Sequence, residues 1–204
     1  MFESQLCGEV ASVPAPPPQL PCNDAGITVV SDTSGDQTGA PANSQLDIQS
    51  ISISEKYVSA STPSRLTFTM KVANLSNPVT PNSVWTIFFT APNGTQYFVD
   101  MSTAGTGTAA VFEYGHTATL ASGSTQQVND GAADASSTYS ADGTITLVID
   151  NTLVGGLKSG DSLVNVLGRS QILAGAAGTG LLATIDSTSA GRYILVVNGY
   201  CNGK

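Results

Sequence analysis

Charged side chains are scarce in this chain, and basic ones are the scarcest. Of its 204 residues, 7 are Lys or Arg and 15 are Asp or Glu, so charged residues make up 11% and the formal net charge is -8. An average protein has roughly 25% charged residues. Nucleic acid would repel so acidic a chain, and no basic cluster offsets the repulsion. We therefore exclude nucleic acid as a partner.

Histidine and long apolar runs are also nearly missing. No apolar run approaches the ~18 residues of a membrane-spanning helix, so we expect no membrane span. His116 is the only histidine. A zinc site needs several His or Cys ligands, and the Gly-x-Ser-x-Gly elbow of many serine hydrolases is missing. A hydrolase that uses His116 therefore stays only as an alternative to a non-catalytic protein.

The composition that remains favours an extracellular protein. The hydrophobic fraction of 41% is enough for a sizeable core. With so few charges, the surface must be built from Ser, Thr, Asn, Gln and Gly, which is common in extracellular bacterial β-proteins. The first ten residues show neither the basic nor the apolar region of a signal peptide. We therefore expect a piece of a longer secreted chain, or a Met1 that is an introduced start.

The three cysteines suggest a bond between the ends of the fold. Cys22 opens the ordered-looking part of the chain and Cys201 closes it. A disulfide between them would contribute roughly 5 kcal/mol in the chain-entropy model. Cys7 would then be left over. Two alternatives stay open, which are a Cys7–Cys22 bond and three free thiols.

The hydrophobic pattern predicts two regions and an all-β fold. Residues 1–21 are rich in proline, which favours an extended linker or arm, and residues 22–204 form the domain. Residues 65–72 alternate apolar and polar side chains, as a half-buried strand does. Asn93-Gly94 between two apolar runs predicts a β-hairpin with Trp85 in the core. The step from Ile48 to Ile51 breaks alternation and suggests a bulge.

About nine short strands and no helix are expected, separated by turn residues. This pattern predicts an antiparallel β-sandwich, either a jelly roll or an immunoglobulin-like Greek key. Residues 116–141 are expected to form a long excursion without a strand. The predicted strands are 26–30, 47–54, 65–72, 84–89, 96–101, 110–114, 144–150, 162–169 and 191–198.

One acidic loop stands out as a candidate metal site. Asp32, Asp36 and Asp47 lie between the first two predicted strands, next to Gly35 and Gly39. Three carboxylates brought close together repel one another unless a cation neutralises them. Calcium suits such a loop because it takes about six to eight oxygen ligands in a flexible geometry. We therefore predict Ca²⁺ on Asp32, Asp36 and Asp47.

The other acidic residues favour a structural interpretation. Most lie beside Gly, Asn or Ser at strand ends, where aspartate caps turns. Asp150-Asn151 and Asp130-Gly131 are weaker candidates for a second cation site. With 6% aromatic residues and one Trp, an aromatic platform for sugars is possible but not favoured. The carboxylates available for a catalytic pair are Asp100, Glu113, Asp130, Asp134, Asp142, Asp150, Asp161 and Asp186.

Several stretches resemble a module found at the C-terminal ends of large secreted bacterial proteins, including subtilisin-like and metallo-peptidases. They are VVSDTSGDQTGAP, LDIQSISISE, RLTFTMKV, NSVWTIFFTAPNGTQYFVDM, FEYGH, YSADGTITLVID and GRYILVVNGYC. The Asp-x-x-Gly-Asp loop is also similar to the start of calcium-binding sandwich modules of the DOMON and family-nine carbohydrate-binding type. Both resemblances imply a non-catalytic β-sandwich with Cys201 as an outer staple.

Three functional interpretations result. The leading one is an extracellular, calcium-stabilised accessory domain that attaches a secreted enzyme to a surface or polysaccharide. Its partners would be a host enzyme domain in a longer chain and that surface. An alternative is a homo-oligomeric subunit of a filament or surface layer, whose arm donates a strand to a neighbour. The third is the hydrolase that uses His116.

Overall fold

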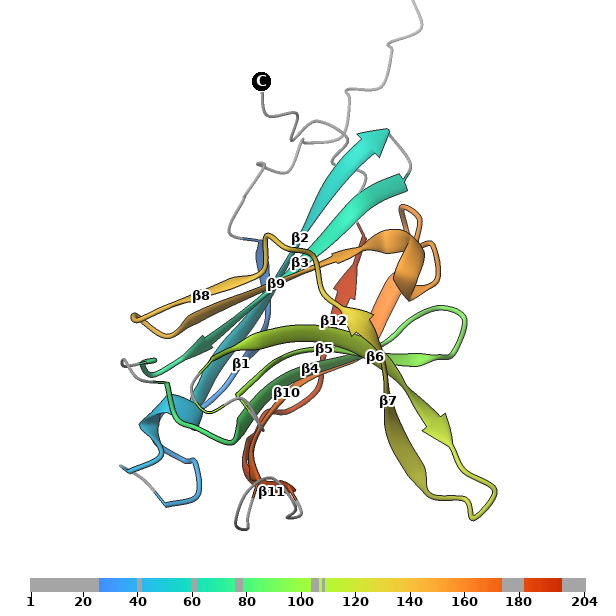
Figure 1. Cartoon of the computed structure of the whole chain (residues 1–204). Helices are drawn as coiled ribbons and strands as arrows, with labels where there is room; N and C mark the ends of the chain where they lie inside the picture. The colour runs from blue at the N-terminus through green and yellow to red at the C-terminus, as the bar shows by residue number, and fades with distance from the viewer. Residues whose placement is uncertain are drawn as a thin grey trace, which may run out of the picture.

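Two antiparallel β-sheets make up the part of the chain that the computed structural model describes, which is residues 26–39, 42–59, 62–75, 79–103, 107, 109–173 and 182–195 (Figure 1). This arrangement confirms the predicted β-sandwich. The elements are β1 (Ile27–Ser31), η1 (Ser44–Leu46), β2 (Ile48–Ser59), β3 (Thr62–Val72), β4 (Ser83–Thr90), β5 (Gln96–Ser102), β6 (Val111–Thr119), β7 (Thr125–Ala132), β8 (Thr138–Ser140), β9 (Thr144–Asp150), η2 (Asn151–Val154), β10 (Ser162–Leu173), β11 (Leu182–Ser187) and β12 (Gly191–Ile194).

In chain order, a four-stranded meander separates the first three strands of one sheet from its last two. The five-stranded sheet has the order β1-β2-β3-β9-β8. The seven-stranded sheet has the order β11-β10-β4-β5-β6-β7, and β12 also pairs with β10. The chain therefore leaves the first sheet after β3, builds β4 to β7 in the second, and returns with β8 and β9. Within the described residues, η1 and η2 are short 3₁₀ turns, and no helix has the length and apolarity to cross a membrane.

The core lies between the facing sides of the two sheets. In β3 the alternation works as predicted, because Leu66, Phe68 and Met70 are fully buried. Phe68 stacks on Phe89 of the opposite sheet with 4.8 Å between ring centroids. Trp85 is also fully buried, as predicted, and its indole Nε1 donates to the Gln45 carbonyl at 2.8 Å. Each such side chain contributes roughly 1.5–3 kcal/mol by leaving water.

Two predicted local features are confirmed. The register of β2 against β3 shifts between Ile48 and Ser50, and this bulge lets Ile48 and Ile51 both point into the core with no exposed area. The predicted hairpin turn joins β4 and β5. There the Ala91 amide donates to the Thr95 carbonyl at 3.0 Å, and Gly94 takes a φ of 82°. A positive φ is accessible to glycine without the steric cost of a Cβ.

Other predictions need correction. The segment 116–141 is not an excursion without strands, because it holds the end of β6, all of β7 and β8. β11 was also not predicted, so the described chain has twelve strands rather than about nine. β7 and β8 expose most of their side chains, so neither has the alternation of a half-buried strand. The arm 1–21, Cys7, Cys22 and Cys201 lie outside the described residues.

Candidate functional site

The loop between β1 and β2 lies against β11, which belongs to the other sheet. The Thr38 amide donates to the Ile185 carbonyl at 2.8 Å. Asp186 Oδ2 accepts a hydrogen bond from the Ile48 amide at 2.7 Å, where β2 begins. These contacts join the acidic loop to a carboxylate that is distant in the sequence.

Three carboxylates meet at this junction. Asp32, Asp36 and Asp186 each place one carboxylate oxygen within 4.8 Å of the other two. Asp36 is exposed and Asp186 is only 8% exposed, so the group extends from the surface into the seam between the sheets. Hard cations such as Ca²⁺ take carboxylate oxygens from separate chain segments in this way. The three residues can therefore hold a metal ion.

The electrostatics of the cluster favour a cation. Asp32 Oδ2 is buried and has no hydrogen-bond partner among the described residues. Burial raises the pKa of Asp32 most, the charges of Asp36 and Asp47 raise it further, and a hydrogen bond with the Thr33 backbone opposes the change. A bound cation would neutralise the charge that this environment disfavours.

The environment of Asp186 also disfavours its ionised form. Burial raises its pKa most, and the charges of Asp32 and Asp36 add to the rise. Hydrogen bonds from the Ile48 and Ser187 amides act in the opposite direction. Gln37, next to Asp36, is 5% exposed and its Oε1 also lacks a partner among the described residues. The junction thus holds more acceptors than the surrounding donors satisfy.

Asp47 has a different role from its two predicted companions. Its carboxylate accepts hydrogen bonds from the Gly35 amide at 2.9 and 3.1 Å and from Ser34 Oγ at 3.4 Å. It is 2% exposed. Asp47 therefore anchors the turn that carries Asp36, while its charge still acts on Asp32. The structure groups Asp32 and Asp36 with Asp186 instead.

The sequence offers Asp186 as one of several carboxylates but not as a metal ligand, because nothing in its sequence surroundings marks it as one. It lies in a short, mostly exposed strand, 150 residues after Asp36 in the chain. Only the pairing of β11 with β10 and the docking of the loop on β11 bring it to the cluster. Acidic loops are visible in a sequence, whereas ligands from a distant strand depend on tertiary structure.

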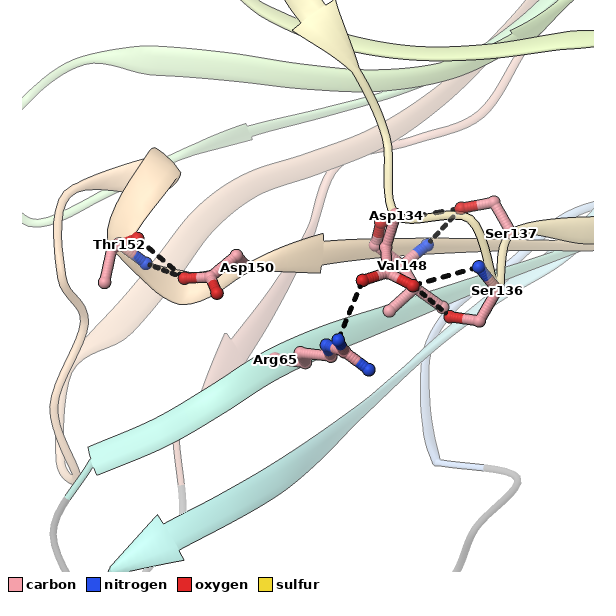
Figure 2. Close-up of polar contacts among 7 residues, drawn as sticks. All are labelled: Arg65, Asp134, Ser136, Ser137, Val148, Asp150 and Thr152. Carbon is pink, nitrogen blue, oxygen red and sulfur yellow. Dashed lines mark hydrogen bonds and ion pairs between the residues drawn. The ribbon is translucent and has the colours of Figure 1, made fainter.

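Most other carboxylates cap turns, as the sequence indicated. Figure 2 shows Asp134 and Asp150 near Arg65. Asp134 accepts from the Ser136 amide and hydroxyl at 2.9 and 2.6 Å, and it forms an ion pair with Arg65 at 3.0 Å. Asp150 accepts from the Thr152 amide and hydroxyl at 2.8 and 2.7 Å. These hydrogen bonds lower the pKa of both carboxyls, which is the pattern of a structural cap.

His116 lies on β6 and pairs with Asp130 of β7. Its Nδ1 is 2.6 Å from Asp130 Oδ2, and both side chains are about one-third exposed. In the described part of the chain, no hydroxyl or thiol hydrogen-bonds to this ring. A nucleophile in reach of the base is the first geometric requirement of a Ser-His-Asp site. The described contacts of His116 do not supply one.

Asp100 on β5 is a carboxyl that caps nothing. Its Oδ1 is buried with no hydrogen-bond partner in the described chain. Burial, together with the charge of Glu113 directly opposite on β6, raises the pKa of Asp100 to about 7. Asp100 is therefore the clearest buried titratable group of the seven-stranded sheet.

Comparison with known proteins adds no relative to this picture. Neither protein-family models, nor curated proteins, nor solved structures gave a match to the chain. Of the resemblances drawn from the sequence, the all-β fold with two antiparallel sheets is confirmed, and membership of a family of secreted modules stays a prediction.

Proposed function

We propose that the chain is a non-catalytic extracellular accessory domain of a secreted bacterial protein, stabilised by Ca²⁺ and attaching its host to a surface or polysaccharide. The observation that carries the calcium part is the grouping of Asp32, Asp36 and Asp186 within 4.8 Å. The polar, charge-poor composition supports the extracellular part.

Calcium is the cation of choice for chemical reasons. The ligands on offer are hard oxygens, and the described cluster includes neither His nor Cys, which zinc prefers. Calcium tolerates irregular sites with bound water, whereas Mg²⁺ demands near-octahedral geometry. A loop and a strand from different sheets can meet the looser requirement more readily.

The position of the cluster explains why calcium would stabilise the domain. Asp32 and Asp36 belong to the β1–β2 connection, and Asp186 belongs to β11 of the other sheet. An ion shared by them joins the two sheets at one end of the sandwich. A ligand that binds only the folded state stabilises it by about 2.7 kcal/mol at about 100 times its dissociation constant.

Thermal unfolding with and without calcium tests the proposal. We expect a rise in Tm of roughly 5 to 10 °C between excess EDTA and millimolar Ca²⁺ for a domain of this size. Asp36→Asn and Asp186→Asn should abolish most of this rise. The comparison uses the difference between the two conditions, because Asp186→Asn also changes the hydrogen bond to Ile48.

Asp130→Asn is the matched control. Asp130 is about one-third exposed, pairs with His116 and lies outside the cluster. Its calcium-dependent rise should equal that of the wild type. The calcium proposal fails if the wild-type Tm is the same in EDTA and Ca²⁺, or if all three variants keep the full rise.

A further inference from the structure

The outward face of the seven-stranded sheet is unusually buried. Side chains of β4 alternate, so Trp85 and Ile87 enter the core while Thr86 and Phe88 point to the other side. Thr86 is nevertheless only 1% exposed and Phe88 only 5% exposed. Something must cover this face.

The β6–β7 hairpin supplies part of the cover. Gly115 on β6 lies so close to its surroundings that a Cβ there would be 2.0 Å from the Val128 carbonyl and 2.6 Å from the Phe98 ring. Figure 1 shows this hairpin as a long twisted ribbon at one edge of the sheet. β7 thereby forms one wall of a hollow whose floor is the outward face.

This hollow is a groove of about 240 Å³ with residues from five strands. Its walls are mostly polar and uncharged, its floor includes Phe88, and its only cationic side chain is Arg169 of β10. The polar wall residues are Gln96, Thr117, Thr125, Gln126 and Gln127.

Arg169 is held in place without an anionic partner. Its guanidinium lies 5.2 Å from the centroid of the Phe88 ring. In the described part of the chain, no carboxylate lies within ion-pairing distance of it. Stacking on an aromatic face orders the planar fork of an arginine while leaving its N–H donors available. The guanidinium of Arg169 is therefore ordered and can pair with an anion from outside the chain.

The neighbouring wall is ordered as well. Thr117 Oγ1 donates to Gln96 Oε1 at 2.9 Å, so the NH₂ end of the Gln96 amide is turned away from Thr117. Amide and hydroxyl groups of this kind pair with the hydroxyls of a sugar. Because Arg169 covers Phe88, the ring is not open for the stacking that a neutral sugar would use.

We propose that this groove binds a polysaccharide at a single uronate residue, with Arg169 pairing with its carboxylate and the Gln and Thr side chains bonding to the hydroxyls of neutral neighbouring sugars. One arginine in the groove suits one carboxylate, whereas the net charge of -8 would repel a fully charged chain. The proposal deepens the attachment role given above and rests on it, but it does not need the calcium cluster. Charge-assisted, bidentate pairing of arginine with a carboxylate provides the selectivity for an acidic over a neutral chain.

Calorimetric titration with defined oligosaccharides tests it. The probes are a galactose tetrasaccharide that carries one galacturonic acid residue and the neutral galactose tetrasaccharide, each titrated into the full chain in EDTA and in millimolar Ca²⁺. We expect the acidic probe to bind in both conditions and the neutral probe to bind at least ~10-fold more weakly, as the loss of a charge-assisted pair implies.

Matched arginine variants locate the site. Arg169→Gln should weaken binding of the acidic probe at least ~10-fold and should remove the preference over the neutral probe. Arg192→Gln is the control, because Arg192 is exposed on β12 of the same sheet, donates to Ser162 Oγ and is not part of the groove. Gln127→Ala on exposed β7 should weaken both probes without changing Tm.

Several results would overturn the proposal that this groove binds an acidic sugar. It is overturned if the wild type binds neither probe, if both probes bind equally, or if Arg169→Gln binds as the wild type does. It is also overturned if binding needs Ca²⁺ and is lost in Asp36→Asn, since the ligand would then sit on the cation. The calcium-dependent rise in Tm should survive in Arg169→Gln, which separates failure of the groove from failure of the calcium site.

Discussion

Asp100 is a single residue whose ionised form destabilises the folded protein. Its carboxyl is surrounded by the outward side chains of β4, β5 and β6, and it has an unpartnered oxygen. A group whose pKa is raised on folding from 3.8 to about 7 binds more protons in the folded state than in the unfolded state between those values. Stability therefore falls as pH rises through this window.

Replacing Asp100 by Asn should remove that pH dependence. We expect Asp100→Asn to unfold at a higher temperature than the wild type at about pH 8, with a free-energy gain of up to about 4 kcal/mol for a fully buried charge. At about pH 4 the two proteins should differ little, because the carboxyl is protonated when folded. Tm measured across this range for both proteins checks the prediction. Parallel Tm profiles would contradict it.

At the same scale, the sequence indicates some residues of the proposed sites and not others. Asp32 and Asp36 were found because Asp and Gly in a short loop between strands are a local signal. The proposed roles of Asp186 and Arg169 have no such local signal, because they depend on which strands pair. Asp47 lies close to Asp32 and Asp36 in the sequence, and in the structure its carboxylate accepts hydrogen bonds from the Gly35 amide of the same loop.

Among the elements, the strands with one buried face were predicted and the exposed ones were missed. β3, β4, β5 and β9 alternate or are strongly apolar, and their predicted positions agree with the structure to within a few residues. β7 has the sequence TQQVNDGA and is partly or fully exposed along its length. Its pairing with β6 is therefore fixed by backbone hydrogen bonds and tertiary contacts. These leave no hydrophobic pattern in the sequence from which the strand could be predicted.

Gly115 is the position at which β6 allows the hairpin to fold over the sheet. Gly115→Ala should lower the free energy of unfolding by about 2 kcal/mol or more, because its Cβ would overlap the Val128 carbonyl and the Phe98 ring. Urea unfolding measures the loss. The same variant should lose affinity for the acidic tetrasaccharide, since β7 would be displaced from the groove.

Gly123→Ala in the β6–β7 turn is the control for Gly115→Ala. A Cβ at Gly123 would meet open space, although its φ of 81° makes alanine strained there. We expect a cost of only about 1 kcal/mol and little effect on the groove. Equal costs for the two variants would mean that close approach at Gly115 is unimportant.

For the whole molecule, polar contacts across the seam between the sheets add to the shared core. Ser170 Oγ of β10 donates to the Leu46 carbonyl at 2.6 Å, and the Trp85 indole donates to Gln45. Near the other end of β2, the Tyr193 hydroxyl bonds to Glu55 Oε1 at 2.5 Å. The candidate calcium site lies beside the first group. It would therefore strengthen a junction that the side chains already form.

The two ends of the described domain also lie together. A Cβ at Gly191, at the start of β12, would be 2.2 Å from the Val29 carbonyl of β1. Cys22 precedes β1 by five residues, and Cys201 follows β12 by seven. A chain of that length extends up to roughly 17 to 25 Å. Both cysteines lie outside the described residues, so the Cys22–Cys201 bond stays a prediction.

Single and double cysteine variants test this bond. Cys22→Ser and Cys201→Ser should each lower Tm under non-reducing conditions, by an amount equivalent to about 3 to 5 kcal/mol. The double variant should be no less stable than either single one, because one bond is lost in every case. Cys7→Ser should leave Tm unchanged. A loss of stability in Cys7→Ser with none in Cys201→Ser would instead assign the bond to Cys7 and Cys22, and the closing cysteine would have no part in holding the sandwich together.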